Sequence, residues 1–231
     1  NKIEALITPK TVAIVPVHVY GSPCDVKKIQ EIADRHHLKV VYDAAHAIGV
    51  EVEGEAIGNF GDASMFSLHG TKVLNSIEGG MAVIDSDQML QEVVSRSNFG
   101  ISDGLTVYDG VNSKMNEFSA AMGIVNLRNL DNNIAKRKVL TEIYDRELGT
   151  VSSLVLLHRR DDVKYNYGYY PVVVKDENLS AEGMTKYLEQ FNIYPRRYFY
   201  PAINQMPLFE EYNKTPIAEE VSKNILCLPL Y

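Results

Sequence analysis

The residues Leu38-Lys39-Val40-Val41-Tyr42-Asp43 form a short apolar run that ends in a carboxylate. Such a run predicts a buried strand. An earlier run, 11–17, predicts a second strand buried on both faces, and the helical spacing of the apolar residues from Asp25 to His36 predicts a helix capped by Asp25. Strand, helix and strand at this length predict a βαβ unit, hence a parallel sheet. Asp43 then stands at the carboxyl end of its strand, where such sheets bind ligands.

A polar loop with one lysine follows the next expected strand, 62–66. The loop reads Ser67-Leu68-His69-Gly70-Thr71-Lys72, and Ile77-Glu78-Gly79-Gly80 comes after it. A carboxylate at a strand end and a hydroxyl shortly before a lysine are the groups that pyridoxal 5′-phosphate (PLP) needs. Lys72 would form an imine with the cofactor aldehyde, Asp43 would hold the pyridinium proton, and Ser67 would bind the phosphate. The ordered set predicts a PLP site.

The rest of the chain continues the α/β pattern. A strand is expected at 80–84, a helix at 87–97 and a glycine- and asparagine-rich loop at 98–114. From 116 to 148 the apolar spacing is helical, which allows either one long bent helix or two in sequence. A strand at 168–174 and a helix at 181–191 complete the pattern. We therefore expect residues 1–125 to belong to a large PLP-binding domain, and residues 126–231 to form the long helix and a smaller C-terminal domain.

Bulk composition excludes several classes of protein. The net charge of −7 argues against nucleic-acid binding, and no apolar run reaches the length of about 18 residues that a membrane helix needs. Two cysteines, Cys24 and Cys227, suggest a reducing compartment, so we expect a cytoplasmic protein. His36-His37 lacks a second ligand pair, so no metal site is expected. The chain lacks an initiator methionine and is interpreted as an excerpt of a longer protein.

Several stretches carry a resemblance to a known family. They are Pro16-Val17-His18-Val19-Tyr20-Gly21, Tyr42-Asp43-Ala44-Ala45-His46, Phe66-Ser67-Leu68-His69-Gly70-Thr71-Lys72 with Glu78-Gly79-Gly80, Gly110-Val111-Asn112-Ser113-Lys114-Met115-Asn116-Glu117, and Leu228-Pro229-Leu230-Tyr231. On these stretches the chain resembles the sugar aminotransferases of the DegT/DnrJ/EryC1/StrS family across essentially its whole length.

The resemblance implies a fold-type-I PLP enzyme, similar to aspartate aminotransferase, with a mostly parallel sheet and a smaller C-terminal α/β domain. It implies a homodimer with active sites shared between subunits. It also implies that the family's glycine-rich phosphate turn, and an aromatic residue that stacks on the ring, lie before Asn1. His46 would lie near the cofactor ring or its 3′-oxygen, unless it is only a packed histidine. Asn112 would reach the partner's phosphate, unless its segment is only a lead-in to the helix capped by Asn116.

Within the family the chain is most similar to the branch that makes dTDP-4-amino-4,6-dideoxyglucose. That match rests on Asp43-Ala44-Ala45-His46-Ala47, Lys72-Val73-Leu74-Asn75 and Pro195-Arg196-Arg197-Tyr198-Phe199-Tyr200-Pro201. Guanidinium geometry suits phosphate oxygens, so Arg196 and Arg197, with Tyr200, are candidates to bind a sugar diphosphate. The alternative is a basic pair on the surface.

The first hypothesis for function is therefore a transaminase that moves an amino group from L-glutamate to a dTDP-4-keto-6-deoxyhexose, for O-antigen or other deoxyaminosugar synthesis. Amination at C3 is a near alternative. A PLP-dependent sugar dehydratase is a second hypothesis, but such relatives carry histidine where this chain has Lys72. A non-catalytic relative with a binding role is the third.

Overall fold

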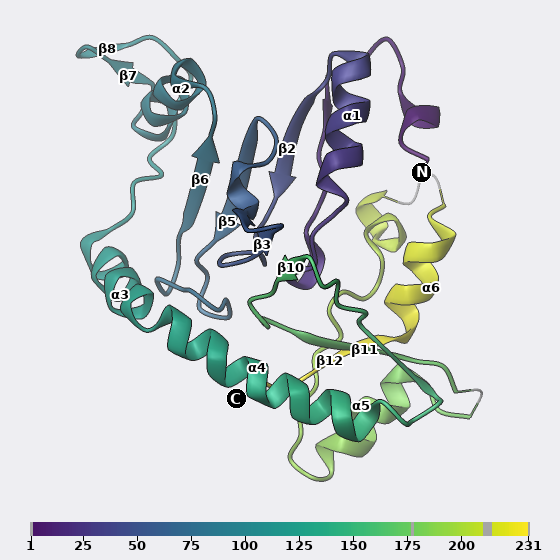
Figure 1. The fold of residues 1–231 in the computed structure, drawn as a ribbon. Coiled ribbons are helices and arrows are strands. Elements are labelled where there is room, and N and C mark those ends of the chain that lie inside the picture. Colours follow the sequence, from purple (N-terminus) through teal and green to yellow (C-terminus); the bar gives the residue numbers. More distant parts are fainter. Residues whose placement is uncertain (1, 177, 210–213, 231) are drawn as a thin grey trace. The chain divides into compact units, whose positions relative to one another are not determined.

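The computed structural model describes residues 2–176, 178–209 and 214–230, so Tyr231 of the last motif lies outside the described residues. The chain divides into two compact units (Figure 1). The first unit comprises Asn1–Asn133 and Asp161–Asn166, and the second comprises Ile134–Arg160 and Tyr167–Tyr231.

A four-stranded sheet is the centre of the first unit, in the order β1-β2-β5-β6. Its strands are β1 (Ala13–Ile14), β2 (Lys39–Asp43), β5 (Ala63–Ser67) and β6 (Gly80–Ile84). β1 and β5 both run parallel to β2, and β6 is antiparallel to β5. The expected mostly parallel sheet is therefore present, with an antiparallel strand on one side.

Helix α1 (Val26–His36) joins β1 to β2, as the βαβ pattern predicts. The Asp25 side chain accepts a hydrogen bond from the backbone N–H of Lys28 at 3.2 Å, which confirms the predicted N-cap. The helix packs against β2 and buries the apolar positions that its spacing singles out: Val26, Ile29, Ile32 and Ala33 (Figure 1).

The run 11–17 is not the long buried strand that its apolar composition predicts. Only Ala13–Ile14 forms a strand, and Val12, Val15 and Val17 are exposed. Pro16 lacks an N–H and interrupts the ladder, although its carbonyl still accepts from Asp43 N at 2.9 Å. β1 lies at the edge of the sheet, and no strand in the described ranges pairs with its outer side.

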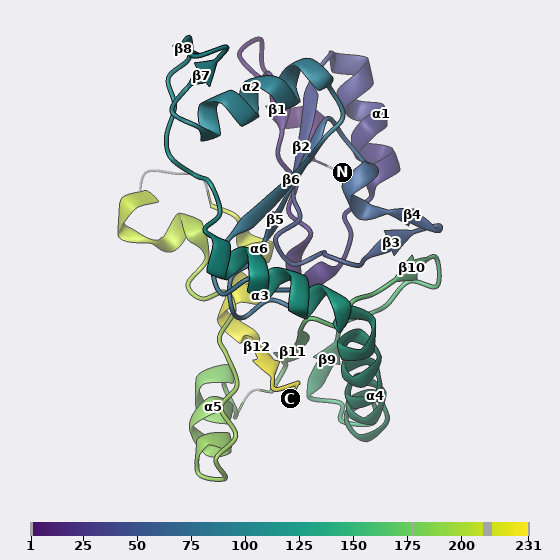
Figure 2. The same ribbon diagram turned by 90° about the vertical axis from the view of Figure 1, so that its left-hand side faces the viewer.

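Smaller elements complete the first unit. A three-stranded antiparallel sheet has the order β10-β3-β4, in which a segment from late in the sequence pairs with β3 (Figure 2). Its strands are β3 (Glu51–Val52), β4 (Glu55–Ala56) and β10 (Val163–Lys164). The predicted helix at 87–97 is confirmed as α2 (Asp87–Ser97). The expected loop 98–114 contains a short hairpin, β7 (Ile101–Ser102) and β8 (Leu105–Thr106), that the pattern did not predict.

The region 116–148 forms two helices in sequence, α3 (Glu117–Arg128) and α4 (Leu130–Leu148). Asn116 caps α3 by accepting a hydrogen bond from Ser119 N at 2.9 Å, as predicted. Asn129 adopts φ −105° and ψ 3°, which ends α3. Of the two expected arrangements, the structure therefore has two helices.

The second unit has an antiparallel sheet in the order β12-β11-β9. The strands are β9 (Leu154–Leu156), β11 (Tyr170–Val174) and β12 (Ile225–Leu228), with helices α5 (Ala181–Glu189) and α6 (Pro216–Asn224). The predicted strand and helix at 168–174 and 181–191 are confirmed as β11 and α5. Their apolar side chains form one core with Leu226 and Leu230. Short 3₁₀ helices occur at Glu4–Leu6, Val19–Gly21, Ile57–Asn59, Ile203–Gln205 and Pro207–Phe209.

Candidate functional site

Asp43 is the last residue of β2 and is held from two sides. Its backbone N–H donates to Pro16 O and its carbonyl accepts from His18 N, each at 2.9 Å. One carboxylate oxygen accepts a hydrogen bond from Ala45 N at 3.0 Å. The side chain is half-buried, and none of the ion pairs among the described residues involves it. A cationic ligand would supply the partner that such a carboxylate requires.

Ser67 ends the neighbouring strand, β5. Because β2 and β5 are parallel with Asp43 opposite Met65, Ser67 lies at the same carboxyl edge as Asp43. Its hydroxyl accepts a hydrogen bond from His69 N at 3.3 Å, which opens the turn toward Lys72. The hydroxyl and the loop amides around it are the kind of groups that bind a phosphate.

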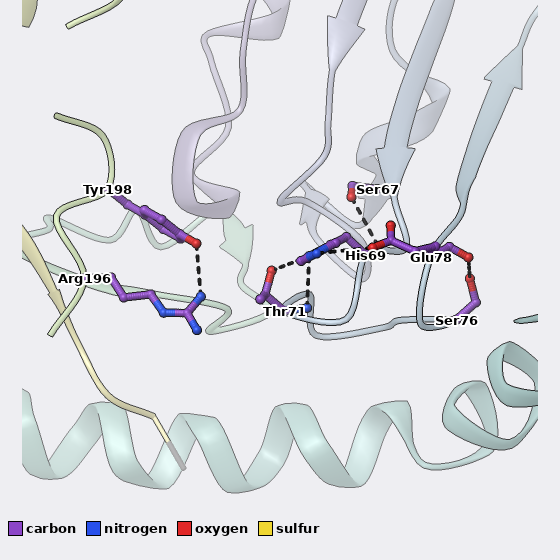
Figure 3. A network of polar contacts seen from close by, with 7 residues as sticks. All are labelled: Ser67, His69, Thr71, Ser76, Glu78, Arg196 and Tyr198. Atoms are coloured by element: carbon purple, nitrogen blue, oxygen red, sulfur yellow. Dashed lines mark hydrogen bonds and ion pairs between the residues drawn. The ribbon is translucent and has the colours of Figure 1, made fainter. Parts of the chain in front are cut away.

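The loop after Ser67 is organised by His69 (Figure 3). The His69 carbonyl accepts from Lys72 N at 2.9 Å. The ring atom Nδ1 accepts from Thr71 N at 3.3 Å and lies 2.9 Å from the Thr71 hydroxyl. The other ring nitrogen, Nε2, is 3.5 Å from the Glu78 carboxylate. These contacts connect the two sides of the lysine loop and give Lys72 a defined backbone position.

The glycine pair that follows the lysine has a steric reason. Gly79 has a φ of +153°, and a Cβ there would be 2.6 Å from Ser76 Oγ and 2.7 Å from Met115 Cε. Ser76 is buried and donates its hydroxyl hydrogen to Glu78 O at 2.8 Å. Leu68 is paired on both sides, with its N–H donating to Gly79 O and its carbonyl accepting from Ser76 N. The loop therefore returns to the sheet through a passage that only glycine fits.

Asp43, His46 and Lys72 influence one another electrostatically. Burial lowers the pKa of the Lys72 ammonium, and the Asp43 carboxylate opposes that shift. The pKa of His46 is lowered to about 4, chiefly by burial and in smaller part by Lys72, and Asp43 again acts in the opposite direction. The three groups therefore lie close enough to act on one another, and their roles in a PLP site stay a prediction. The lowered pKa of Lys72 favours the neutral amine, which is the form that can react or accept a proton.

His46 has a fixed ring. Its Nδ1 accepts a hydrogen bond from Tyr20 N at 3.0 Å, and the two rings lie nearly parallel with centroids 6.3 Å apart. His18, to which the sequence assigned no role, is completely buried and stacks on Tyr42 at 4.6 Å. Its Nδ1 accepts from Cys24 N at 3.1 Å, and burial lowers its pKa to about 4. His18 therefore belongs to the buried packing around the end of β2, next to Asp43.

Asn112 lies in the exposed segment that precedes α3. It forms an isolated antiparallel bridge with Asn98, and Lys114 nearby donates to the Asn98 side chain at 2.8 Å. The contacts within one chain thus explain how the segment is held. A role of Asn112 across a dimer interface remains a prediction.

In the second unit, the two candidate arginines differ in their contacts. Arg196 is exposed and donates to the Tyr198 hydroxyl at 3.0 Å (Figure 3). Arg197 donates to the carbonyls of Ile225, Lys223 and Ser222 at the end of α6, at 3.0, 2.7 and 3.4 Å. Its guanidinium also lies 4.4 Å from the centre of the Tyr200 ring. These contacts make Arg197 a C-terminal cap for α6, which leaves Arg196 the more accessible candidate for a phosphate.

The groups at the carboxyl edge of the sheet fit PLP. Asp43 can pair with a pyridinium, Lys72 can provide the amine, and Ser67 with the loop N–H groups can bind a phosphate. Among the described residues, no three His, Cys, Asp or Glu side chains gather in a group that could hold a metal ion. None of the helices described here combines the length and apolar character needed to cross a membrane. The fold and these groups are typical of α/β proteins that bind PLP.

Comparison with known proteins identifies the family. The model of the DegT/DnrJ/EryC1/StrS aminotransferase family matches residues 1–231, and the chain belongs to this family. PLP, the cofactor predicted from the sequence, is the cofactor of the family. The predicted fold is confirmed as well. The likeness extends to a solved structure of DesI with its TDP-sugar product, with a TM-score of 0.91 and 30% identity, over 98% of this chain and 59% of that one.

Two curated relatives show the range of sugars in the family. A dTDP-4-amino-4,6-dideoxy-D-glucose transaminase of Escherichia coli is 39% identical over 100% of this chain and 64% of its own length. A GDP-perosamine synthase of Vibrio cholerae is 31% identical over 98% of this chain and 63% of its own. The chain thus spans less than two thirds of the curated relatives it matches.

The different contacts of the two arginines generate a prediction about stability. Replacing Arg197 by alanine should lower the free energy of unfolding by about 1–3 kcal/mol, because carbonyls at the end of α6 lose their donor. Arg196→Ala is the matched control and should change it by less than about 0.5 kcal/mol. Denaturant unfolding of both variants would measure this, and equal small effects would contradict the capping role.

Proposed function

We propose that the intact protein is a PLP-dependent aminotransferase that moves an amino group from L-glutamate to a dTDP-4-keto-6-deoxyhexose. The observation that carries the proposal is the group of Asp43, His46 and Lys72 at the carboxyl edge of the sheet, acting on one another electrostatically. The dTDP-linked sugar is favoured by the similarity to the Escherichia coli transaminase. A GDP-linked sugar, amination at C3 and a dehydratase reaction are the alternatives.

Each residue of the candidate site would have a separate task. When bound, PLP supplies an electron sink for the bond that is broken at the amino-bearing carbon. Lys72 Nζ would accept the proton from that carbon and would later give a proton to the sugar carbon that receives the amino group. The lowered pKa of Lys72 supports this task. The Asp43 carboxylate would keep the ring nitrogen protonated, and Ser67 with the loop N–H groups would hold the phosphate. Arg196, with Tyr200, is the proposed contact for the sugar diphosphate.

We also propose, on the family resemblance, that two copies share their sites, with Asn112 reaching the partner's phosphate. On the same ground we place the reaction in the synthesis of deoxyaminosugars such as those of O-antigens, and the two cysteines, which suggest a reducing compartment, favour the cytoplasm. The presence of Lys72 weighs against the dehydratase alternative. A non-catalytic relative would have no need to keep Lys72 partly desolvated beside Asp43.

The decisive experiment supplies the intact protein with L-glutamate and a panel of keto sugars linked to dTDP or GDP. NMR of the products would then locate the new amine. Amination of the dTDP-4-keto sugar supports the proposal. If another keto sugar of the panel is aminated instead, that sugar is the substrate and the dTDP-4-keto assignment is wrong. If no keto sugar is aminated, the transaminase assignment is overturned.

The first prediction for the reaction concerns Lys72. Lys72→Ala should abolish covalent attachment of the cofactor, whereas PLP still binds through its phosphate and ring. Borohydride reduction, digestion and mass spectrometry should find the phosphopyridoxyl group on Lys72 in the parent protein, and in the control Lys39→Ala. Finding that mass on any other lysine would show that the site is assigned to the wrong residue.

A second prediction concerns Asp43. Asp43→Asn should keep the fold but lower turnover by about a thousandfold, or about 4 kcal/mol of barrier, because the lost charge no longer holds the ring nitrogen protonated. Asp103→Asn is a matched control in an exposed turn, where Asp103 has a φ of 49° that asparagine also adopts. Turnover near the parent value in Asp43→Asn would mean that Asp43 is only structural.

A third prediction concerns Asn112 and the shared site. Lys72→Ala and Asn112→Ala subunits of the intact protein are each expected to be impaired alone. If Asn112 acts across the interface, one site of a mixed dimer collects both defects and the other is intact, so mixing should restore activity. If Asn112 serves its own chain, each of the two sites carries one defect, and mixing should not restore activity. Mixed dimers that form without regaining activity would remove Asn112 from the shared site.

A further inference from the structure

Asn166 is a buried polar residue that the sequence analysis did not single out. It is 1% exposed, and its side-chain N–H groups donate to His46 O and Ile48 O, each at 2.8 Å. Both carbonyls belong to the turn that follows Asp43. One buried amide thus holds two points of the segment on which Asp43 and His46 lie.

The pairing of β10 with β3 brings Asn166 to this turn. Val163 pairs with Val52 and Lys164 with Glu51. The segment 161–166 therefore belongs to the first unit, although it follows residues 134–160 of the second unit in the sequence. The Lys164 ammonium also contacts the Glu51 carboxylate at 2.5 Å. Asn166 follows directly on this pairing, which gives its side chain little freedom to move away.

Gly21 and Tyr20 close the arrangement from a third segment. Gly21 has a φ of +78°, and a Cβ there would lie 2.8 Å from Asn166 Oδ1 and 2.9 Å from His46 O. Only glycine therefore lets the three segments approach so closely. The neighbouring Tyr20 N–H donates to His46 Nδ1 at 3.0 Å, so the arrangement includes the ring of His46 as well as its backbone.

The hydrogen bond from Tyr20 decides the tautomer of His46. A backbone N–H can only donate, so Nδ1 must accept and the proton of the neutral ring lies on Nε2. Burial and the Lys72 ammonium disfavour the charged ring, Asp43 favours it, and the net pKa is about 4. At neutral pH His46 is therefore a hydrogen-bond donor through Nε2 and not a base.

We propose that Asn166 is a positioning residue of the cofactor site: by holding His46 O and Ile48 O, it fixes the turn after Asp43 and keeps His46 in the Nε2–H tautomer. The ligand that this donor serves is the PLP of the proposed function, at an acceptor oxygen of the cofactor. The hydrogen-bonded clamp itself exists in the chain without the cofactor, so it can be tested separately.

The test is an NMR titration of the intact, cofactor-free protein with ¹⁵N-labelled histidine, in which His46→Gln assigns the His46 signals. The parent protein should show the Nε2–H tautomer and a titration midpoint at about pH 4, the value that burial sets. In Asn166→Ala the turn should loosen and admit water, so the midpoint should rise toward 6.5, its ordinary value, and both tautomers should appear. An unchanged midpoint and tautomer in this variant would overturn the proposal.

Two further variants keep the test independent of general destabilisation. Asn166→Ser retains one donor and should give an intermediate midpoint, which also serves if Asn166→Ala does not fold. Asn129→Ala is the control, because the Asn129 side chain donates to Val125 O at 3.1 Å at the end of α3 and not to the turn after Asp43 or to the lysine loop. That control should leave His46 as it is in the parent protein, and an equal rise in it would count against a specific role for Asn166.

The titration does not depend on catalysis, so its result stands even if no keto sugar is aminated. In the loaded enzyme, Asn166→Ala should lower kcat by about tenfold or more with little change in KM for glutamate, because the site is misaligned and not emptied. Loss of activity without any change at His46 would assign Asn166 a purely structural role and contradict the proposal.

Discussion

The parallel pairing of β2 with β5 is the constraint on which the candidate site depends. With Asp43 opposite Met65, both strands end at one edge, and the carboxylate comes to lie beside the strand end that carries Ser67 and leads to Lys72. Two backbone hydrogen bonds hold that strand end from the other side: Asp43 N–H donates to Pro16 O, and Asp43 O accepts from His18 N. A carboxylate held this firmly and half-buried is costly to leave without a cation, so the same geometry that forms the site also favours a cationic ligand in it.

Burial at this edge has opposite consequences for the neighbouring groups. It lowers the pKa of Lys72 and so shifts that group toward the neutral amine, and it is the largest cause of the lowering of the His46 pKa to about 4, which removes His46 as a base. Asp43 opposes both shifts because its negative charge stabilises each cation. In the proposed reaction the three groups would thus have separate roles: Asp43 as an anion, Lys72 as an amine that can carry a proton, and His46 as a neutral hydrogen-bond donor.

Two polar side chains with many contacts have roles that their residue type does not reveal. Arg197 resembles a phosphate ligand in the sequence, yet its guanidinium satisfies carbonyls at the end of α6. Asn166 resembles an ordinary loop residue, yet its amide joins segments that are far apart in the chain. In both cases a backbone carbonyl, which carries no sequence signal, is the partner.

The sequence alone determined those features that depend on local physics. The spacing in α1 and the cap at Asp25 set that helix, the apolar run ending in Asp43 set β2, and the order of Asp43, Ser67 and Lys72 indicated the cofactor. Only the tertiary structure decided the short β1, the glycine passage at Gly79, the capping by Arg197 and the clamp of Asn166 on His46. All four features depend on which distant segments of the chain meet. Burial and backbone pairing arise where such segments are in contact, and the neighbouring residues in the sequence do not determine them.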